Sequence, residues 1–437
     1  MEPAKGVVDA LPTRSYKTPA NLKSRMAFKK NTHCRYCRSP RLQQFISLGD
    51  QPPSNDFLRP DQIASERRYP LDVYLCEDCA LAQLIDVVSG DSIFDDYAYL
   101  SSSSKALCQH YVTMAASLTT RYGLKAGDVV VDIGCNDGVL LKGYAPAGLV
   151  RVGVEPSKVA DYAEQAGFEV VREFFGAQAA RKIVAAHGPA AVVTATNVFA
   201  HVDDIHSFVA GIAPLLREDG VFVIESPYLV DMIEQCLFDT IYHEHLCYYS
   251  LTPMVPFFRQ HGLEVVDVGR VNFGASGPAF RTVVAKRGGP HQPSPAVNQM
   301  LADEEAWGIR RLDRYAGFAQ AAAGVKNQVL GMLRELKARG ATIGGFGAPA
   351  KGNTMLNYLG VTRDLVECVA ENNPLKQGKV TPGAHLPIVS DEEFLRRMPD
   401  YALLLTWNYA DFFLKHSEYI RRGGKFIVPL PKPRMAP

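Results

Sequence analysis

The chain has 437 residues, of which 47% are hydrophobic and 21% charged, and its formal net charge is +1. This length predicts two or three domains, and the neutral charge argues against nucleic-acid or acidic membrane partners. No apolar run approaches the roughly 18 residues that span a bilayer, and the first residues lack the apolar core of a secretion signal. We therefore expect a cytoplasmic protein with no nucleic-acid or membrane partner, either a monomer or a small homo-oligomer.

The first part of the chain carries paired cysteines. Residues 1–30 are predicted to form a mobile tail, because Pro, Lys, Ala and Ser alternate there without a sustained period. Residues 31–90 contain two C-x-x-C pairs, Cys34/Cys37 and Cys76/Cys79. Two such knuckles supply the four thiolates of a tetrahedral, structural zinc site; the alternative is four unrelated thiols. The Pro- and Asp-rich stretch between the pairs predicts loops and short strands with little core.

Residues 91–288 alternate between strand and helix signals. Short β-branched runs predict strands at 129–133, 151–154, 191–195 and 221–224, with helices at 157–166 and 205–216 between them. This order predicts an α/β domain with a doubly wound parallel sheet. Two later strands, 263–268 and 279–285, are joined by a loop too short for a crossover helix, so we expect them to pair antiparallel at one edge.

A second set of α/β signals occupies residues 289–437. A long helical region is predicted over 296–339, followed by shorter elements. Strands are expected at 341–346, 366–370, 402–406 and 425–429, and helices at 351–358 and 410–421. The C-terminal part is therefore predicted to be a Rossmann-like α/β domain.

A glycine-bearing turn follows the first strand of the central domain. In Asp132-Ile-Gly-Cys-Asn-Asp-Gly138 the spacing lacks the dinucleotide fingerprint, and Glu155 ends the next strand, where an acid can bind both ribose hydroxyls. Adenosine attached to something other than pyrophosphate is favoured, and S-adenosylmethionine fits. The alternative is a merely tight turn. The residues assigned to this cofactor are Asp132, Gly134, Asn136, Gly138, Glu155 and Asn197.

The segment 240–250 holds the densest set of acid/base groups. Tyr242, His243, Glu244 and His245 are consecutive, which suggests proton transfer. A helix would bring Tyr242 to His245, whereas an extended chain would bring Tyr242 to Glu244; a solvent-facing charged segment is the plain alternative. His201, just past the strand 191–195, is open to a catalytic or a surface role. Tyr97 and Tyr99 are equally open to packing or to the site.

The C-terminal domain repeats the strand, glycine turn and helix pattern at 344–353. Lys351 lies inside this turn, so backbone N–H groups and one cation resemble a phosphate cradle, although the spacing is not that of an NTPase. Loops after the next strand suit the base or sugar of a nucleotide. The residues assigned to substrate are Tyr99, Lys351, Asn353, Glu371 and Asn372.

The ordered combination of these motifs resembles the sugar C-methyltransferases that act on nucleotide-linked deoxy-ketosugars in antibiotic biosynthesis. The resemblance rests on the C-x-x-C pairs, DIGCNDG, GVEPS (153–157), NVFAHV (197–202), YHEHLCYYS (242–250) and GFGAPAKGN (345–353). It implies a zinc domain, a class I methyltransferase-type domain that binds S-adenosylmethionine, and a C-terminal domain that helps to bind the nucleotide diphosphate.

The resemblance also implies an active site and a reaction. Tyr242, Glu244, His245, His201 and one of Tyr97 or Tyr99, with Tyr97 favoured, would line the site; the family often has Tyr where this chain has His243. The expected reaction methylates the carbon beside the ketone of a 4-ketosugar, linked to thymidine diphosphate, through an enolate. The alternatives are a nicotinamide-dependent nucleotide-sugar oxidoreductase, a non-catalytic nucleotide-binding zinc protein, and a methylase of nucleic acid or protein.

Overall fold

A central sheet of seven strands organises the molecule. The computed structural model describes residues 28–90, 100–145, 148–272, 274 and 277–436. The sheet order is β12-β13-β10-β9-β6-β7-β8. Its strands are β6 (Val129–Ile133), β7 (Val150–Val154), β8 (Glu169–Val171), β9 (Ala190–Thr196), β10 (Leu216–Pro227), β12 (Leu263–Val271) and β13 (Ala279–Lys286). All pairs from β8 to β10 are parallel, and β13 and β12 add antiparallel strands at one edge, as predicted.

Both faces of this sheet are covered, which explains why the central strands β6 and β9 are buried along their whole length. Val130 and Val192 belong to a core under α2 (Lys105–Arg121) and α3 (Val139–Gly143). Their neighbours Val131 and Val193 point the other way, because side chains alternate along a strand. The elements on that second side include α5 (Ala177–His187), α6 (Ile205–Leu215) and α8 (Leu251–Gln260); α4 (Ala160–Gln165) follows β7, and α7 (Leu229–Glu234) follows β10.

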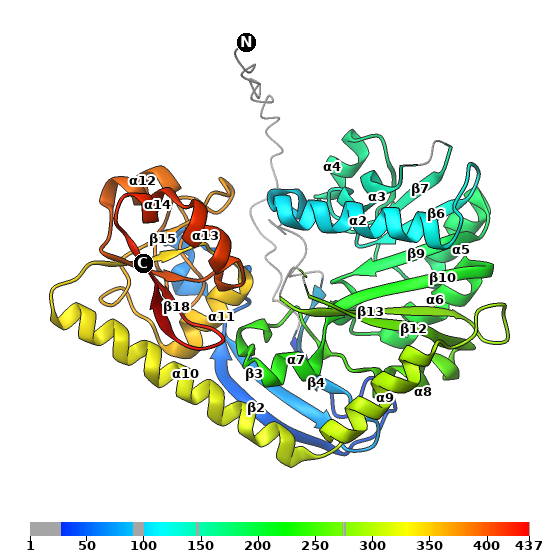
Figure 1. Cartoon of the computed structure of the whole chain (residues 1–437), viewed down its shortest axis with the longest axis horizontal. Helices are drawn as coiled ribbons and strands as arrows, with labels where there is room; N and C mark the ends of the chain where they lie inside the picture. The colour runs from blue at the N-terminus through cyan, green and yellow to red at the C-terminus, as the bar shows by residue number, and fades with distance from the viewer. Residues whose placement is uncertain (1–27, 91–99, 146–147, 273, 275–276, 437) are drawn as a thin grey trace, which may run out of the picture.

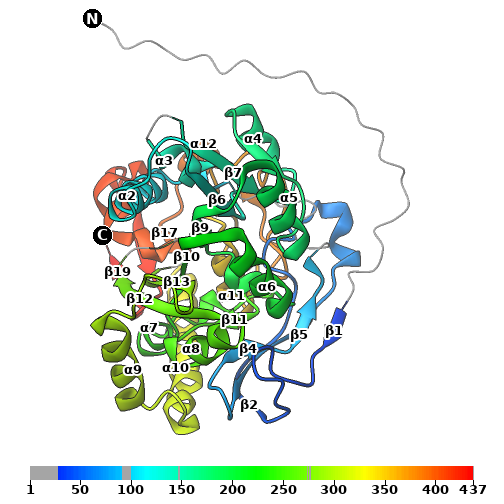
Figure 2. The same cartoon turned by 90° about the vertical axis from the view of Figure 1, so that its right-hand side faces the viewer.

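The N-terminal part is more ordered than the sequence predicted. A second sheet has the order β11-β4-β3-β2, from β2 (Leu42–Gln51), β3 (Tyr69–Cys76), β4 (Ala82–Leu84) and β11 (Cys247–Tyr248); β1 (Phe28–Lys30) pairs with β5 (Asp86–Val88). The expectation of short strands with little core was wrong, since Leu71 and Val73 are fully buried. Part of that core comes from distant segments: β11 lies beside β4, and α10 (Leu312–Ala338) packs on β2 (Figures 1 and 2).

The C-terminal part is a six-stranded sheet in the order β16-β15-β14-β17-β18-β19. Its strands are β14 (Ile343–Phe346), β15 (Val369–Ala370), β16 (Ile388–Val389), β17 (Tyr401–Leu404), β18 (Lys425–Val428) and β19 (Arg434–Ala436). Only β19 runs antiparallel to its neighbour among these described strands. The helices are α11 (Ala350–Leu359), α12 (Asp391–Arg397), α13 (Ala410–His416) and α14 (Glu418–Arg421).

Two helices predicted as continuous are broken. The region 296–339 consists of α9 (Pro295–Trp307) and α10, because Gly308 ends α9 in the left-handed conformation with φ of 89°. The region 410–421 divides at Ser417, whose hydroxyl accepts the N–H of Tyr419 and starts α14. In the described part of the chain, no helix is long and apolar enough to cross a membrane.

A buried carboxylate joins α9 to the central domain. Glu304 is fully buried, and its carboxylate accepts the backbone N–H groups of Leu251 and Thr252, each at 2.7 Å, at the start of α8. The Tyr228 hydroxyl donates to the same carboxylate at 3.0 Å. The two backbone N–H groups would otherwise be unsatisfied at the N-terminus of α8, where a negative charge is also favoured.

We predict that Glu304→Ala lowers the free energy of unfolding by about 3 kcal/mol, because it leaves the buried N–H of Leu251 and the partly buried N–H of Thr252 without an acceptor. Urea denaturation followed by circular dichroism measures this. Glu305→Ala, at the exposed neighbouring position, is the matched control and should change stability by less than about 0.5 kcal/mol. Equal losses in both variants would contradict this account.

Candidate active site

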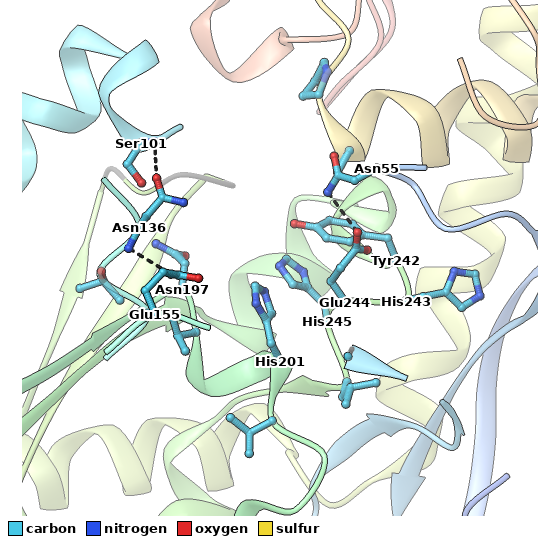
Figure 3. Close-up of a pocket in the computed structure, with 18 of the residues that line it drawn as sticks. Asn55, Ser101, Asn136, Glu155, Asn197, His201, Tyr242, His243, Glu244 and His245 are labelled. Atoms are coloured by element: carbon cyan, nitrogen blue, oxygen red, sulfur yellow. Dashed lines mark hydrogen bonds between the residues drawn. The ribbon is translucent and has the colours of Figure 1, made fainter. Parts of the chain in front are cut away.

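A cavity of about 1060 Å³ lies where the N-terminal, central and C-terminal parts meet. Many of the residues predicted from sequence line it, and Figure 3 shows those nearest the central sheet. The lining members are Gly134, Asn136, Glu155, Asn197, His201, Tyr242, Glu244, His245, Lys351, Glu371 and Asn372. Asp132, Gly138 and Asn353 lie outside this lining, and Tyr97 and Tyr99 fall outside the described residues.

On one side of the cavity, Glu155 fixes the glycine turn after β6. Its Oε2 accepts the N–H of Asn136 at 3.1 Å, and its Oε1 accepts the N–H and hydroxyl of Ser157 at 3.0 and 2.6 Å. Gly134 has φ of 66°, and a Cβ there would lie 2.3 Å from Cγ2 of Val198. Only glycine therefore permits this turn without displacing its neighbour. The Asn136 side chain accepts the N–H of Ser101 at 2.9 Å (Figure 3).

Two of the residues predicted to bind the cofactor, Asp132 and Gly138, lie outside the cavity lining, at the two ends of the glycine turn. Asp132 is buried in β6, and Thr194 donates to its carboxylate at 2.6 Å. Burial raises the pKa of Asp132 to about 7. Gly138 begins α3 in the left-handed conformation. The Glu155 carboxylate therefore lies at the cavity beside a tight backbone turn. This arrangement suits the ribose and the attached chain of an adenosine cofactor.

On the other side of the cavity, the segment 241–246 folds as a turn rather than a helix or strand. The N–H of His245 donates to the carbonyl of Tyr242 at 2.8 Å, and β11 begins two residues later. The ring centroids of Tyr242 and His245 are 3.9 Å apart, and those of His201 and His245 are 5.2 Å apart. The turn thus brings Tyr242 to His245, and His201 approaches from the end of β9 (Figure 3).

The hydrogen bond of His245 assigns its tautomer. Nδ1 lies 2.7 Å from the carbonyl oxygen of Thr240. Since a carbonyl only accepts, Nδ1 carries the proton and Nε2 keeps the lone pair. Burial lowers the pKa of His245 to about 4, and burial together with the neighbouring His245 lowers the pKa of His201 to about 3. Both imidazoles are therefore neutral near pH 7.

Glu244 is buried and close to its titration point at neutral pH. Burial raises its pKa to about 7, while the Asn55 amide, which donates to Oε1 at 3.0 Å, opposes that rise. His243 differs from its neighbours: its ring is directed away from His245 and meets Tyr69 edge-on, with ring centroids 6.0 Å apart (Figure 3).

The C-terminal wall of the cavity contains two buried lysines. Lys351 donates to the side-chain oxygen of Asn408, and its ammonium lies 4.3 Å from the ring centroid of Trp407. Burial lowers the pKa of Lys351 to about 8, against the opposing charge of Asp239. Lys376 donates to the carbonyl of Ala348 at 2.9 Å. Asn353, two residues past Lys351, is buried and donates instead to the carbonyl of Ser54 at 2.7 Å.

The four predicted metal ligands come together outside the cavity. The Sγ atoms of Cys34, Cys37, Cys76 and Cys79 all lie within 4.8 Å of one another. Tetrahedral zinc, with Zn–S bonds of about 2.3 Å, requires sulfur–sulfur distances of about 3.8 Å. The pairs Cys34/Cys79 and Cys37/Cys76 are 3.5 Å apart, so the cluster fits that ion. The Gln83 amide donates to Sγ of Cys34 at 3.1 Å.

Comparison with known proteins agrees with this arrangement. C-methyltransferase NovU of Streptomyces niveus is 36% identical over 405 residues, which cover 92% of this chain and 96% of that protein. The chain belongs to this family of C-methyltransferases. Family descriptions match along its length: "Putative zinc binding domain" at 34–94, "Methyltransferase domain" at 108–268 and "C-methyltransferase C-terminal domain" at 275–431.

Solved structures resemble parts of this C-methyltransferase. A Haloferax volcanii methyltransferase in complex with the Trm112 activator is 15% identical, covers 45% of this chain and 99% of its own, and has a TM-score of 0.36. The magnesium protoporphyrin IX methyltransferase of Synechocystis PCC 6803, with bound S-adenosylmethionine, is 14% identical, covers 41% and 79%, and has a TM-score of 0.31.

The family assignment confirms the methyltransferase activity, the S-adenosylmethionine cofactor and the zinc site that the motifs predicted. The roles of individual cavity residues stay predictions. Sequence reasoning missed Asn55, Lys376 and Asn408, which also line the cavity. Lys376 follows the predicted substrate loop at Glu371 closely enough to have been included, whereas Asn55 and Asn408 had no signal beyond their polar character.

We predict one zinc ion per chain of this C-methyltransferase, measured by plasma mass spectrometry on purified protein. Cys76→Ser should lose most of the metal and lower the thermal unfolding temperature, because the knuckles are held through the ion. Cys108→Ser, a cysteine outside the cluster, is the control and should keep the metal. Zinc-free wild-type protein with unchanged stability would overturn the assignment.

Proposed function

We propose that this enzyme methylates the carbon beside the ketone of a nucleotide-linked 4-keto-deoxysugar, with thymidine diphosphate as the carrier. The observation that carries the proposal is the imidazole of His245, neutral and with a free Nε2 lone pair, between Tyr242 and His201 at the cavity. A carbon beside a ketone becomes nucleophilic only after losing a proton, and this group is a base suited to that step.

In the proposed reaction, Nε2 of His245 removes the proton, directly or through the Tyr242 hydroxyl. The Thr240 carbonyl, bonded to Nδ1, holds the ring in the correct tautomer and stabilises the imidazolium that forms. Although burial lowers the pKa of the free imidazole, the negative charge developing on the substrate offsets this by pairing with the new cation.

The negative charge on the substrate oxygen also needs a donor. Tyr242 or His201 would donate to the enolate oxygen, an interaction worth about 2–4 kcal/mol in the transition state. Glu244 would orient His245 or a sugar hydroxyl. Bound S-adenosylmethionine supplies the electrophilic methyl group, and Gly134, Asn136, Glu155 and Asn197 would hold it at the opposite side of the cavity.

The nucleotide diphosphate is assigned to the C-terminal wall. Lys351 and Lys376 are cations at the cavity, and Glu371 and Asn372 lie in the loop after β15. Lys351 donates to Asn408, and Lys376 donates to the Ala348 carbonyl and lies 3.7 Å from the Glu371 carboxylate. Buried cations attract phosphate oxygens more strongly than exposed lysines do. This placement leaves the sugar in the middle, between the acid/base turn and the methyl donor.

The test is mass spectrometry of purified protein incubated with S-adenosylmethionine and a panel of nucleotide-linked 4-ketosugars. We expect a single methyl increment on one sugar, and exchange of the adjacent C–H with deuterium from solvent. If cofactor binding is shown separately and no ketosugar on the panel is methylated, the acceptor class is wrong.

We predict that His245→Ala lowers turnover by about 10²–10⁴-fold, as expected for loss of a general base, with little change in S-adenosylmethionine affinity. Steady-state kinetics and calorimetry measure the two effects. His243→Tyr is the control, because that ring is directed away from His245 and should leave turnover within a few-fold. A near-normal rate in His245→Ala would exclude it as the base.

A further inference from the structure

A side chain from the N-terminal part reaches the acid/base turn. Asn55 lies in the loop between β2 and the 3-10 helix Pro60–Ser65, and its amide donates to Oε1 of Glu244 at 3.0 Å (Figure 3). Glu244 is only 2% exposed, and its Oε2 has no hydrogen-bond partner within the described ranges. Asn55 therefore supplies a side-chain hydrogen bond to this carboxylate, in addition to the one from the backbone N–H of Glu244 itself.

The loop that carries Asn55 is held from the C-terminal part. The carbonyl of Ser54 accepts the Asn353 amide at 2.7 Å, and its hydroxyl lies 3.0 Å from the hydroxyl of Thr354. All three residues are buried. Asn353 and Thr354 belong to α11, whose first turn also places Lys351 at the cavity. Hydrogen bonds from α11 to Ser54, and from its chain neighbour Asn55 to Glu244, thus join α11 to Glu244.

We propose that Asn55 is a positioning residue for Glu244, and that α11 fixes Asn55 through Ser54. The inference rests on the proposed function for the use of Glu244, but the contacts themselves are independent of the acceptor. Asn353, predicted from sequence to bind substrate, acts in this scheme on the loop and not on the ligand.

The groups around Glu244 determine whether loss of the Asn55 amide raises or lowers the pKa of Glu244. Burial, and to a smaller extent Asp56 in the same loop, raise the pKa of Glu244. Burial and nearby charges, that of Glu244 among them, raise the pKa of Tyr248 in β11. Within its own turn, the imidazoles of His243 and His245 are both kept neutral by burial. Asn55 opposes these influences, because an N–H donor favours the ionised carboxylate.

Removing the amide should therefore raise the pKa of Glu244. Burial raises the pKa of wild-type Glu244 to about 7. In Asn55→Ala the midpoint should rise by about one pH unit, the size expected for one hydrogen bond to a carboxylate. Asn55→Asp should raise it further, since a second carboxylate would face the first.

The experiment is a pH titration by difference infrared spectroscopy on the full-length protein with ¹³C-labelled glutamate. The protonated-carboxyl band that is present in wild type and missing in Glu244→Gln is the band of Glu244. We expect the band to persist to higher pH in Asn55→Ala, and in Asn353→Ala to a smaller extent. Asn31→Ala is the matched control: Asn31 is another N-terminal asparagine that donates to a carboxylate, that of Asp203, at 3.2 Å, and it should leave the band unchanged.

An Asn55→Ala midpoint equal to wild type overturns the proposal, and an Asn353→Ala midpoint equal to wild type overturns the part assigned to α11. If Asn55→Ala does not fold by circular dichroism, Asn55→Leu removes the donor while keeping the volume. The titration needs no turnover, so it is read even if no ketosugar is methylated and the proposed function fails. Where turnover is found, kcat/KM should fall on the acid side of its pH profile at a higher pH in Asn55→Ala than in wild type, by the same shift as the infrared band.

Discussion

The pairing of β11 with β4 is the contact on which the active site depends. It involves only Cys247 and Tyr248 opposite Ala82 and Gln83. The N–H of Leu84 extends the contact by donating to the carbonyl of Leu246, and the N–H of Leu246 donates to the carbonyl of Ala200, next to His201. The same few residues of backbone thus set the positions of His245 and His201 relative to each other.

This pairing also gives the zinc site a function in the architecture. The second cysteine knuckle, Cys76–Cys79, connects β3 to β4. A metal that holds this turn also holds β4, the strand that pairs with β11, without contacting the cavity. A bound ion would therefore hold the position of the turn 241–246 through main-chain hydrogen bonds.

Sequence predicted the parts of the fold that depend on local pattern. The strands β6, β9 and β10 are buried on both faces, so their valine runs were visible, and the cysteine pairs and glycine turn were equally clear. The N-terminal sheet was underestimated because α10 and β11, far away in the chain, complete its core. A two-residue strand such as β11 has no periodicity to detect.

In the candidate site, too, the features encoded by local sequence were predictable, whereas those that depend on distant segments were not. The crowding of Tyr242 and His245 in one short segment marked them, but their geometry required the turn to be seen. Asn55 follows two prolines and a serine, a context that indicates a loop and nothing more. The link from Asp239 to Trp407, whose indole donates to its carboxylate, joins residues 168 apart and has no local signal.

Burial dominates the pKa of two polar groups at the cavity, Glu244 and Lys351. Their partners oppose it only in part: the backbone N–H of Glu244 and the Asn55 amide for the carboxylate, and Asp239 for the lysine. Such groups respond strongly to small changes in contact, because the low local dielectric amplifies each hydrogen bond. The cavity is therefore sensitive to the fit among the three parts of the chain.

The distances along the chain between these partners bear on how the enzyme is made. Asn55 and Glu244 are 189 residues apart, and Ser54 and Thr354 are 300 apart. Contacts between such distant segments form late, since loop-closure entropy opposes them. As the ribosome delivers the chain from its N-terminus, the central sheet is complete after β13, but the loop at Ser54 must wait for α11 to emerge. The contacts between the Ser54 loop and α11 therefore form only when synthesis of the chain has nearly finished.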